Sequence, residues 1–267
     1  MGVERAGDIF EAVLYRDVTA VEEILKMNPS ASLLTDTAST TESVTSTVFC
    51  GLATSGRMRD GSTPLILASR LGYIEIVSLL IKQSNCDFKF VNKRGMNALH
   101  TAAEAGNVDV LDALMQTKQF DVNVYTRHND QSEGETFTHT RWTPLFFASQ
   151  SEKSIDCIKT LLEKYDADPN LVNSEGQSSL HIACYMFQVE AAKLLILHNA
   201  DCTLKDIYGA TPITKLGMGC DYGVTNEEKK QAMDEINEYM KKNSISTVLK
   251  GGKNVKTWID RIVKYTS

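Results

Sequence analysis

A short segment recurs along this chain at a nearly constant spacing, and this repetition constrains the fold more than any single residue does. The segment Gly61–Ala68 reads GSTPLILA, and related segments begin at Gly95, Arg141, Gly176 and Gly209. We interpret the spacing as a period of 33 residues with insertions, which predicts a stack of similar supersecondary units. The anchor positions, which include a degenerate copy near the start, lie 56, 34, 46, 35 and 33 residues apart at Ala12, Ala68, Ala102, Ala148, Ala183 and Leu216.

The residues of one unit predict two short helices. Thr63 can cap the first helix with its hydroxyl, and Pro64 fits the first helical turn, where a backbone N–H would have no partner. After Gly72, the run 74–81 is so apolar that its helix must be covered by neighbours on both sides. Because no helix pair closes a core alone, we expect the units to be stable only as a stack.

The Thr-Pro-Leu-x-x-Ala segment and the 33-residue period resemble the ankyrin repeat, whose signature is T-P-L-H-x-A. The resemblance covers residues 5 to about 242 and is strongest in the second, third and fifth copies. It implies an all-α fold, an ankyrin-repeat solenoid of about six helix-turn-helix repeats with hairpin loops and a helical C-terminal cap. It also implies that His100 and His181, at the fourth signature position, form hydrogen bonds between neighbouring turns.

Three positions depart from the repeat pattern. Gly72 and Gly106 end the first helix of their units, whereas Arg16, Glu152 and Phe187 stand at the corresponding places. Glycine is favoured there because the chain often turns through the left-handed region after a helix. We therefore expect those three turns to carry strain or to follow a different local path.

We assign the predicted solenoid to residues 1–242. Two insertions interrupt it. The first, about 30–56, is rich in Ser and Thr and is interpreted as a polar loop, with phosphorylation as an open alternative. The second, about 127–140, contains His128 and His139 among acidic residues. These histidines lack the helical spacing of a zinc site, so we predict a solvated hairpin extension and no metal.

The C-terminal region has a different charge from the rest. Thr225 to Glu228 form a capping box that opens a helix, and this helix is expected to complete the sixth repeat. We assign residues 243–267 to a basic amphipathic C-terminal helix, because seven basic residues and one acidic residue lie in 241–267. This helix either caps the solenoid or binds an acidic membrane surface or calmodulin.

Charge and motif content exclude several function classes. The 34 acidic residues outnumber the 28 basic ones, which argues against nucleic acid as a partner. Phosphate-loop, zinc-protease and hydrolase motifs are absent, and six scattered cysteines indicate buried thiols rather than disulfides or metal ligands. We expect no enzyme activity, catalytic residue, cofactor or metal. No apolar window is long enough for integral membrane association. The sequence has no N-x-S/T glycosylation acceptor, which fits an intracellular protein in the cytoplasm or nucleus, and we expect a monomer.

After these exclusions, the function class that remains is the recognition of another protein. The resemblance implies a concave face of hairpin tips and first helices that binds another protein. On this face, Trp142 is either an exposed anchor or a side chain packed by the adjacent insertion. The partner-binding candidates carried over from the family's variable positions are Arg59, Asp60, Arg70, Lys93, Arg94, Met96, Glu104, Trp142, Gln150, Glu175, Gln177, Tyr185, Met186 and Tyr208, with Ile207 beside the last.

The sequence therefore predicts a non-enzymatic interaction scaffold or adaptor whose partner is another protein. The alternative is a regulatory or targeting subunit that acts through its basic C-terminal helix. An enzymatic role would require the chain to be a fragment of, or a subunit bound to, a catalytic partner, because one repeat architecture serves many unrelated functions.

Overall fold

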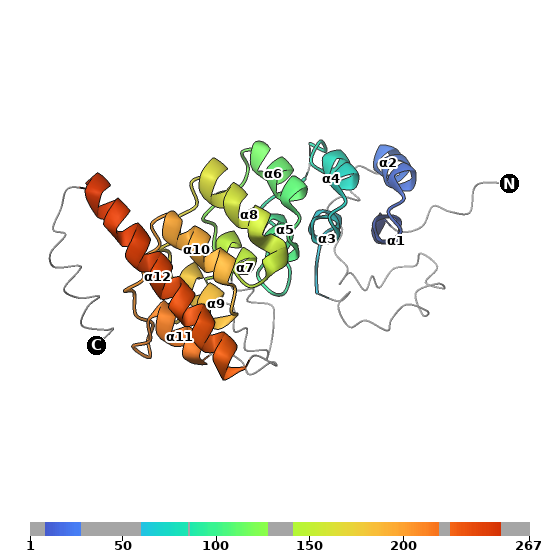
Figure 1. Ribbon diagram of the computed structural model, residues 1–267. Coiled ribbons are helices and arrows are strands. Elements are labelled where there is room, and N and C mark those ends of the chain that lie inside the picture. Colours follow the sequence, from blue (N-terminus) through green and yellow to red (C-terminus); the bar gives the residue numbers. More distant parts are fainter. Residues whose placement is uncertain (1–8, 28–59, 85, 128–140, 219–224, 252–267) are drawn as a thin grey trace. The chain divides into compact units, whose positions relative to one another are not determined.

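The computed structural model describes residues 9–27, 60–84, 86–127, 141–218 and 225–251. Within these residues the chain is helical, contains no strand, and forms six consecutive helix pairs (Figure 1). The predicted all-α repeat fold is thus confirmed. The chain divides into two compact units, one of residues 1–168 and 172–174 and the other of residues 169–171 and 175–267.

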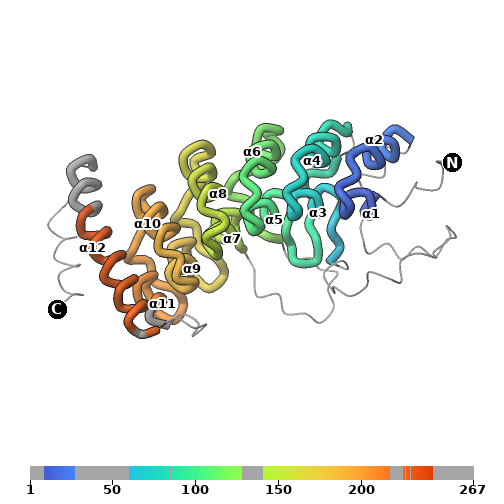
Figure 2. Tube along the Cα trace, turned by 45° about the vertical axis from the view of Figure 1, so that its right-hand side comes forward, coloured from blue at the N-terminus to red at the C-terminus, as the bar shows by residue number. Residues whose placement is uncertain are grey.

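The first unit contains four helix pairs. Its first helices contact one another in sequence, and its second helices form a second row (Figure 2). The first row consists of α1 (Ile9–Leu14), α3 (Pro64–Leu71), α5 (Ala98–Ala105) and α7 (Pro144–Ala148). The second row consists of α2 (Val18–Met27), α4 (Ile74–Leu80), α6 (Val108–Gln116) and α8 (Ile155–Lys159), the last flanked by the 3-10 turn η2 (Glu152–Ser154) and the π-helical turn η3 (Thr160–Lys164).

The second unit contains two helix pairs, α9 (Ser179–Tyr185) with α10 (Val189–Leu197), and α11 (Pro212–Met218) with α12 (Asn226–Gly251). Helix α9 packs against α10 and α11, and α12 packs against α10 and α11. Ala232 and Ile236 of α12 are buried in this contact. At its edge, Lys193 of α10 forms ion pairs with Glu190 and with Glu235 of α12.

The repeat anchors lie at the centre of the packing. Five of the six anchor positions, Ala68 to Leu216, have no exposed surface, and Ala12 is 7% exposed. The apolar run of the second repeat behaves as its sequence predicts, since Ile76, Val77 and Leu80 are completely buried. Small residues at the anchors let neighbouring first helices approach closely, and the apolar second helices fill the space behind them.

At the three turns that lack the usual glycine, the structure shows both expected outcomes, backbone strain and an altered chain path. Gly72 has a φ of +76°, and Arg16 and Phe187 adopt the same left-handed region with φ of +54° and +56°. These two residues therefore carry backbone strain that glycine avoids. At Glu152 the path differs, because α7 ends early at Ala148 and Glu152 begins a 3-10 turn.

The start of α12 is as predicted. The Thr225 N–H donates to Glu228 Oε2 at 2.7 Å, and the Glu228 N–H donates back to Thr225 Oγ1 at 3.2 Å. The helix continues to Gly251, so the predicted boundary between 242 and 243 does not coincide with a helix end. The first insertion, residues 128–140 of the second, and residues 252–267 lie outside the described residues.

Candidate partner-binding surface

A single polar side chain closes the hairpin loop in three of the described repeats. Asn92 Oδ1 accepts the N–H groups of the residues two and four positions further on, both at 3.0 Å. Asp206 Oδ1 does the same at 3.0 and 2.8 Å. In the repeat that carries the second insertion, Thr126 Oγ1 accepts the Trp142 N–H at 3.0 Å. The hairpin tips are thus held in shape by groups of the chain itself, which lowers the entropy cost of binding a partner.

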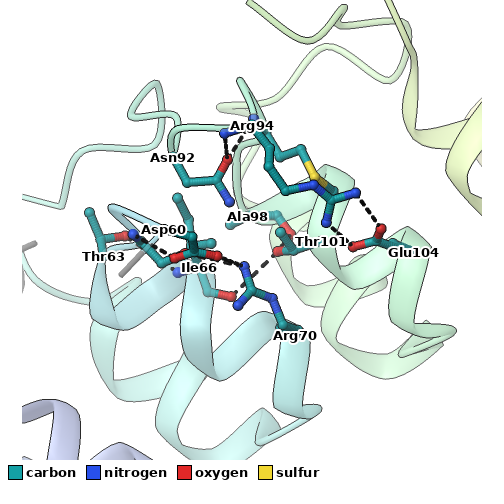
Figure 3. A network of polar contacts seen from close by, with 11 residues as sticks. Asp60, Thr63, Ile66, Arg70, Asn92, Arg94, Ala98, Thr101 and Glu104 are labelled. Atoms are coloured by element: carbon teal, nitrogen blue, oxygen red, sulfur yellow. Dashed lines mark hydrogen bonds and ion pairs between the residues drawn. The ribbon is translucent and has the colours of Figure 1, made fainter. Parts of the chain in front are cut away.

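In the second and third repeats two positions face each other, namely the residue before the tip glycine and the residue two places after the anchor. In the second repeat they hold Asp60 and Arg70, whose Oδ2 and Nη2 atoms lie 2.5 Å apart. In the third repeat the charges are exchanged, and Arg94 donates to both carboxylate oxygens of Glu104 at 2.8 and 3.2 Å (Figure 3). The structure therefore brings these four predicted site residues together as two ion pairs.

These ion pairs are partly shielded from solvent. The side chains of Arg70 and Asp60 are 25% and 18% exposed, and those of Arg94 and Glu104 are 35% and 27% exposed. Pairs of this kind contribute at most about 1 kcal/mol each to stability. Their larger effect is to fix each tip against its own helix and to cancel charge on this part of the surface.

Neighbouring repeats of the first unit are joined behind this surface. The Asn107 side-chain amide donates to the carbonyls of Ser69 and Arg70 at 2.8 and 2.9 Å. At the tips, the Lys93 N–H donates to the Asp60 carbonyl at 2.8 Å, while the Lys93 side chain is exposed. The surface is consequently rigid along the stack as well as within each repeat.

Two predicted site residues are buried, so their placement on an exposed binding surface is wrong. Met96 has no exposed surface, and Trp142 is 8% exposed. The Trp142 ring packs against Phe146 and Phe147, with centroid distances of 5.8 and 5.2 Å. Of the two interpretations of Trp142, the packed one is therefore correct, although its described aromatic contacts come from α7 and the insertion lies outside the described residues.

The second unit presents a different surface at the same positions. Tyr185 occupies the place of Arg70 and Glu104, and Tyr208 occupies the place of Asp60 and Arg94. Tyr208 is 73% exposed, its neighbour Ile207 is 64% exposed, and Met186 is 40% exposed. Exposed apolar and aromatic side chains that lie next to one another, as Ile207 and Tyr208 do, are typical of interaction sites.

A buried ion pair stabilises the hairpin that carries Tyr208. Lys215 Nζ lies 2.7 Å from Asp206 Oδ2, and the two side chains are 12% and 0% exposed. The same ammonium lies over the Tyr208 ring, 5.5 Å from its centroid. Burial of the Asp206 carboxyl by itself raises its pKa, but hydrogen bonds from Lys215 and two backbone N–H groups outweigh burial, so the pKa is lowered. Asp206 is therefore ionised at neutral pH.

The remaining predicted residues are distributed over both units. Gln150 of the first unit is partly exposed, as are Glu175, Gln177 and Tyr185 of the second. Arg59 lies outside the described residues. Exposure of these side chains is compatible with partner contact, but their role in binding stays a prediction.

His100 and His181 have the structural role that the resemblance implied. His100 Nδ1 accepts the Asn97 N–H at 3.2 Å, and its Nε2 lies 3.1 and 3.2 Å from two carbonyls, those of Val124 and Trp142. Burial lowers the pKa of His100 to about 4, although the two carbonyls act to raise it. Burial also lowers the pKa of His181, whose Nε2 lies 3.2 Å from the Ala210 carbonyl. Both rings are neutral and join successive repeats.

The described cysteines are free, and their thiols are protonated at neutral pH. Burial, with a smaller effect of a neighbouring aspartate, raises the pKa of Cys86 to about 11 and those of Cys157 and Cys202 to about 12. Within the described ranges, no cluster of three or more His, Cys, Asp or Glu residues could hold a metal ion. Among the helices described, none is both long enough and apolar enough to cross a membrane.

Sequence reasoning missed Asp206 and Lys215, which position the Tyr208 hairpin. A signal for Asp206 is present in the repeats, because Asn92, Asn173 and Asp206 each stand five residues before the residue that starts the next signature. Lys215 gives no such signal, since its position in other repeats is held by Leu67, Thr101, Phe147 and Ile182.

Comparison with known proteins agrees with this repeat structure. A family model described as "Ankyrin repeats (3 copies)" matches residues 9–126 and 126–206. Together these matches cover the four helix pairs of the first unit and the α9–α10 pair of the second, and they extend to Asp206.

Curated relatives share the repeats but are much longer proteins. Glycerophosphocholine phosphodiesterase GDE1 of Candida albicans is 25% identical over 69% of this chain and 16% of its own length. Ankyrin repeat protein nuc-2 of Neurospora crassa is 26% identical over 69% of this chain and 17% of its own length. The ankyrin repeat protein FPV031 of fowlpox virus is 32% identical over 53% of this chain and 38% of its own length. The chain thus spans well under half of each of these proteins.

Proposed function

This chain belongs to the ankyrin repeat family, and from that membership we propose that it is a non-enzymatic scaffold or adaptor that binds another protein through its concave face and hairpin tips. Ankyrin repeats generally mediate interactions between proteins. The finer proposal concerns where the partner binds and which side chains supply the binding energy.

The change of residue type at equivalent positions carries this proposal. In the first unit these positions hold the self-paired charges Asp60–Arg70 and Arg94–Glu104, which already satisfy one another. In the second unit they hold Glu175 with Tyr185 in the fifth repeat and Tyr208 in the sixth, with Ile207 exposed beside the last. Tyrosine is enriched among residues that dominate binding energy, because it buries a large apolar area and keeps a polar end. We therefore assign the main anchors to the second unit and charge-based selectivity to the first.

The other parts of the proposal follow from the family and from the chain's charge. We propose that the chain acts as an intracellular monomer without catalytic activity of its own, and that an acidic surface keeps it from nucleic acid. The alternative role of the basic C-terminal segment in binding a membrane or calmodulin stays a prediction, because residues 252–267 lie outside the described residues.

The test measures affinity for a partner isolated with the full chain. Tyr185→Ala and Tyr208→Ala are each compared with the wild-type chain by calorimetry or biolayer interferometry, and folding is monitored by thermal unfolding. We expect each variant to weaken binding by about 2 kcal/mol, or roughly thirtyfold, with little change in stability.

Leu197→Ala is the matched control, since Leu197 is 53% exposed but lies on α10, the second helix of its pair. It removes an exposed apolar side chain of comparable accessibility outside the proposed surface, so affinity should not change. If Leu197→Ala weakens binding and the two tyrosine variants do not, the partner binds elsewhere and the proposal is wrong.

A further inference from the structure

Successive hairpin tips are joined by a backbone hydrogen bond with a defined pattern. In the first unit, the Lys93 N–H of one tip donates to the Asp60 carbonyl of the preceding tip at 2.8 Å. In the second unit, the Ile207 N–H donates to the Glu175 carbonyl at 2.9 Å. In both cases the acceptor is the residue before the tip glycine and the donor belongs to the next tip along the stack. Between the third and fourth repeats, the Arg127 N–H donates instead to the carbonyl of the tip glycine Gly95, at 3.0 Å.

Tyr208 is the residue at this acceptor position in the last hairpin that the structure describes. None of the hydrogen bonds among the described residues ends on its carbonyl oxygen. The space next to the following residue, Gly209, is also free of described atoms. A Cβ placed on Gly95 would lie 1.9 Å from the Arg127 carbonyl oxygen, and one placed on Gly176 would lie 3.3 Å from the Asp206 Cα. A Cβ on Gly209 would meet no described atom within 4 Å.

The N–H groups of the same hairpin are all used. Those of Tyr208 and Ala210 donate to Asp206 Oδ1, that of Gly209 donates to the Asp206 carbonyl at 2.9 Å, and that of Ile207 is the donor described above. The outer edge of the hairpin therefore offers carbonyl acceptors and no backbone donor. Two copies of this edge cannot pair with each other, because neither supplies an N–H.

We propose that this outer edge, residues 207–210, is a docking edge for an extended backbone segment of a partner protein, in the place that the next hairpin tip takes elsewhere in the stack. The segment donates one backbone N–H to the Tyr208 carbonyl, and its backbone packs directly against Gly209. This inference rests on the proposed function and specifies what part of the partner is recognised.

The side chains at the edge define the chemistry of the segment. Ile207 and Tyr208 are 64% and 73% exposed, so the segment carries apolar side chains that cover them. Gly209 lets the two backbones approach closely, as Gly95 does under Arg127. Because the Asp206–Lys215 pair and the Asp206 hydrogen bonds fix the hairpin, the edge is formed before the segment binds.

The variant Gly209→Asn blocks the edge and leaves the hairpin intact. Asparagine tolerates the left-handed φ of +77° at this position, and its side chain enters space that no described atom fills. The chain already accepts a non-glycine residue at the equivalent place, where Arg141 has a φ of +62°. A docked backbone in the geometry seen at Gly95 would collide with the new side chain.

Random peptides displayed on phage are selected on the immobilised full chain, and the selected peptides are then synthesised as probes. We expect peptides with apolar side chains whose affinity falls about tenfold or more on Gly209→Asn, with unfolding of that variant unchanged within about 1 kcal/mol. We also expect N-methylation of one particular peptide amide to abolish binding while methylation of its neighbours does not.

Tyr185→Ala separates this inference from the proposed function, because it alters the first-helix position and leaves the edge unchanged. Peptides that depend on Gly209 should bind Tyr185→Ala as they bind the wild-type chain. A selection that returns no peptide sensitive to Gly209→Asn, or peptides that tolerate N-methylation at every position, overturns the docking edge. A protein partner lost on Tyr185→Ala but retained on Gly209→Asn would overturn it too and leave the proposed function standing.

Discussion

Arg70 and Glu104 occupy the same position in consecutive repeats, carry opposite charges, and each pair with the tip residue of their own repeat. The repeat geometry thus determines which two positions meet, and either the tip residue or the helix residue can carry the positive charge. This freedom is how one backbone can present different surfaces without loss of stability. In the second unit the same positions hold Glu175 with Tyr185 in the fifth repeat and Tyr208 in the sixth, so tyrosines replace part of the charged set.

Exchange of the charges in the third repeat should be tolerated. The double variant Arg94→Glu with Glu104→Arg gives that repeat the polarity of the second, and we expect its free energy of unfolding to lie within about 0.5 kcal/mol of wild type. Either single variant places like charges together and should lose about 1 kcal/mol. Urea unfolding of the four proteins measures this, and additivity of the two single changes would show that the pair is not coupled.

Trp142 should behave as a core residue. Trp142→Ala removes a ring packed on Phe146 and Phe147, and we expect a loss of about 3 kcal/mol or more in unfolding free energy. Tyr208→Ala, at 73% exposure, should change stability by no more than about 0.5 kcal/mol. Equal stability losses for the two variants in chemical denaturation would contradict the assignment of Trp142 to the interior.

Two tip glycines should respond differently to alanine. Gly95→Ala places a Cβ 1.9 Å from the Arg127 carbonyl oxygen in addition to the strain of a φ of +73°, so a loss of about 3 kcal/mol or more is expected. Gly209→Ala has the same backbone strain without the collision and should cost about 1 kcal/mol. Thermal unfolding distinguishes these values. Similar costs for both would mean that the tips do not approach each other as described.

His100 should make stability depend on pH. Its pKa is about 4 in the folded chain and about 6.5 when unfolded, so the unfolded chain binds a proton first as pH falls. Stability from this group is complete above pH 6.5 and is lost toward pH 4, by about 3 kcal/mol in total.

The measurement is the free energy of unfolding of wild type and His100→Gln at several pH values between 7 and 4. The glutamine variant should show a shallower pH dependence in that interval. Identical slopes for the two proteins would show that His100 is not a buried neutral ring. NMR titration of the His100 ring gives the same information directly.

The fold was predictable from the sequence because the repeat imposes its own register. Anchors at Ala68, Ala102 and Ala148 set the spacing of the first helices, and the apolar run 74–81 required cover on two sides. The left-handed turn at Gly72 and the backbone strain at Arg16 could be predicted from the same alignment of the repeats. Each of these conclusions depends on local sequence and on a period, which are both visible in one chain.

The candidate surface was less predictable, because exposure is decided by neighbours in space. Met96 and Trp142 share a repeat position with Ser62 and Ala210, which are also buried, and with Gln177, which is partly exposed, so residue type at this position does not predict exposure. The pairing of Arg94 with Glu104 depends on a distance across the hairpin that no motif encodes. Lys215 stands at a position that the second to fifth repeats fill with uncharged residues, and only the structure shows that Asp206 compensates its charge.

Hydrogen–deuterium exchange of the full chain, with and without its isolated protein partner, tests the central claim most directly. We predict that the partner slows exchange in the hairpin tips and first helices, in residues 92–105 and above all in 175–186 and 205–210. The second helices α4, α6 and α10 should be unchanged. Protection confined to those second helices, with the tips exchanging as in the free chain, would contradict recognition through this surface.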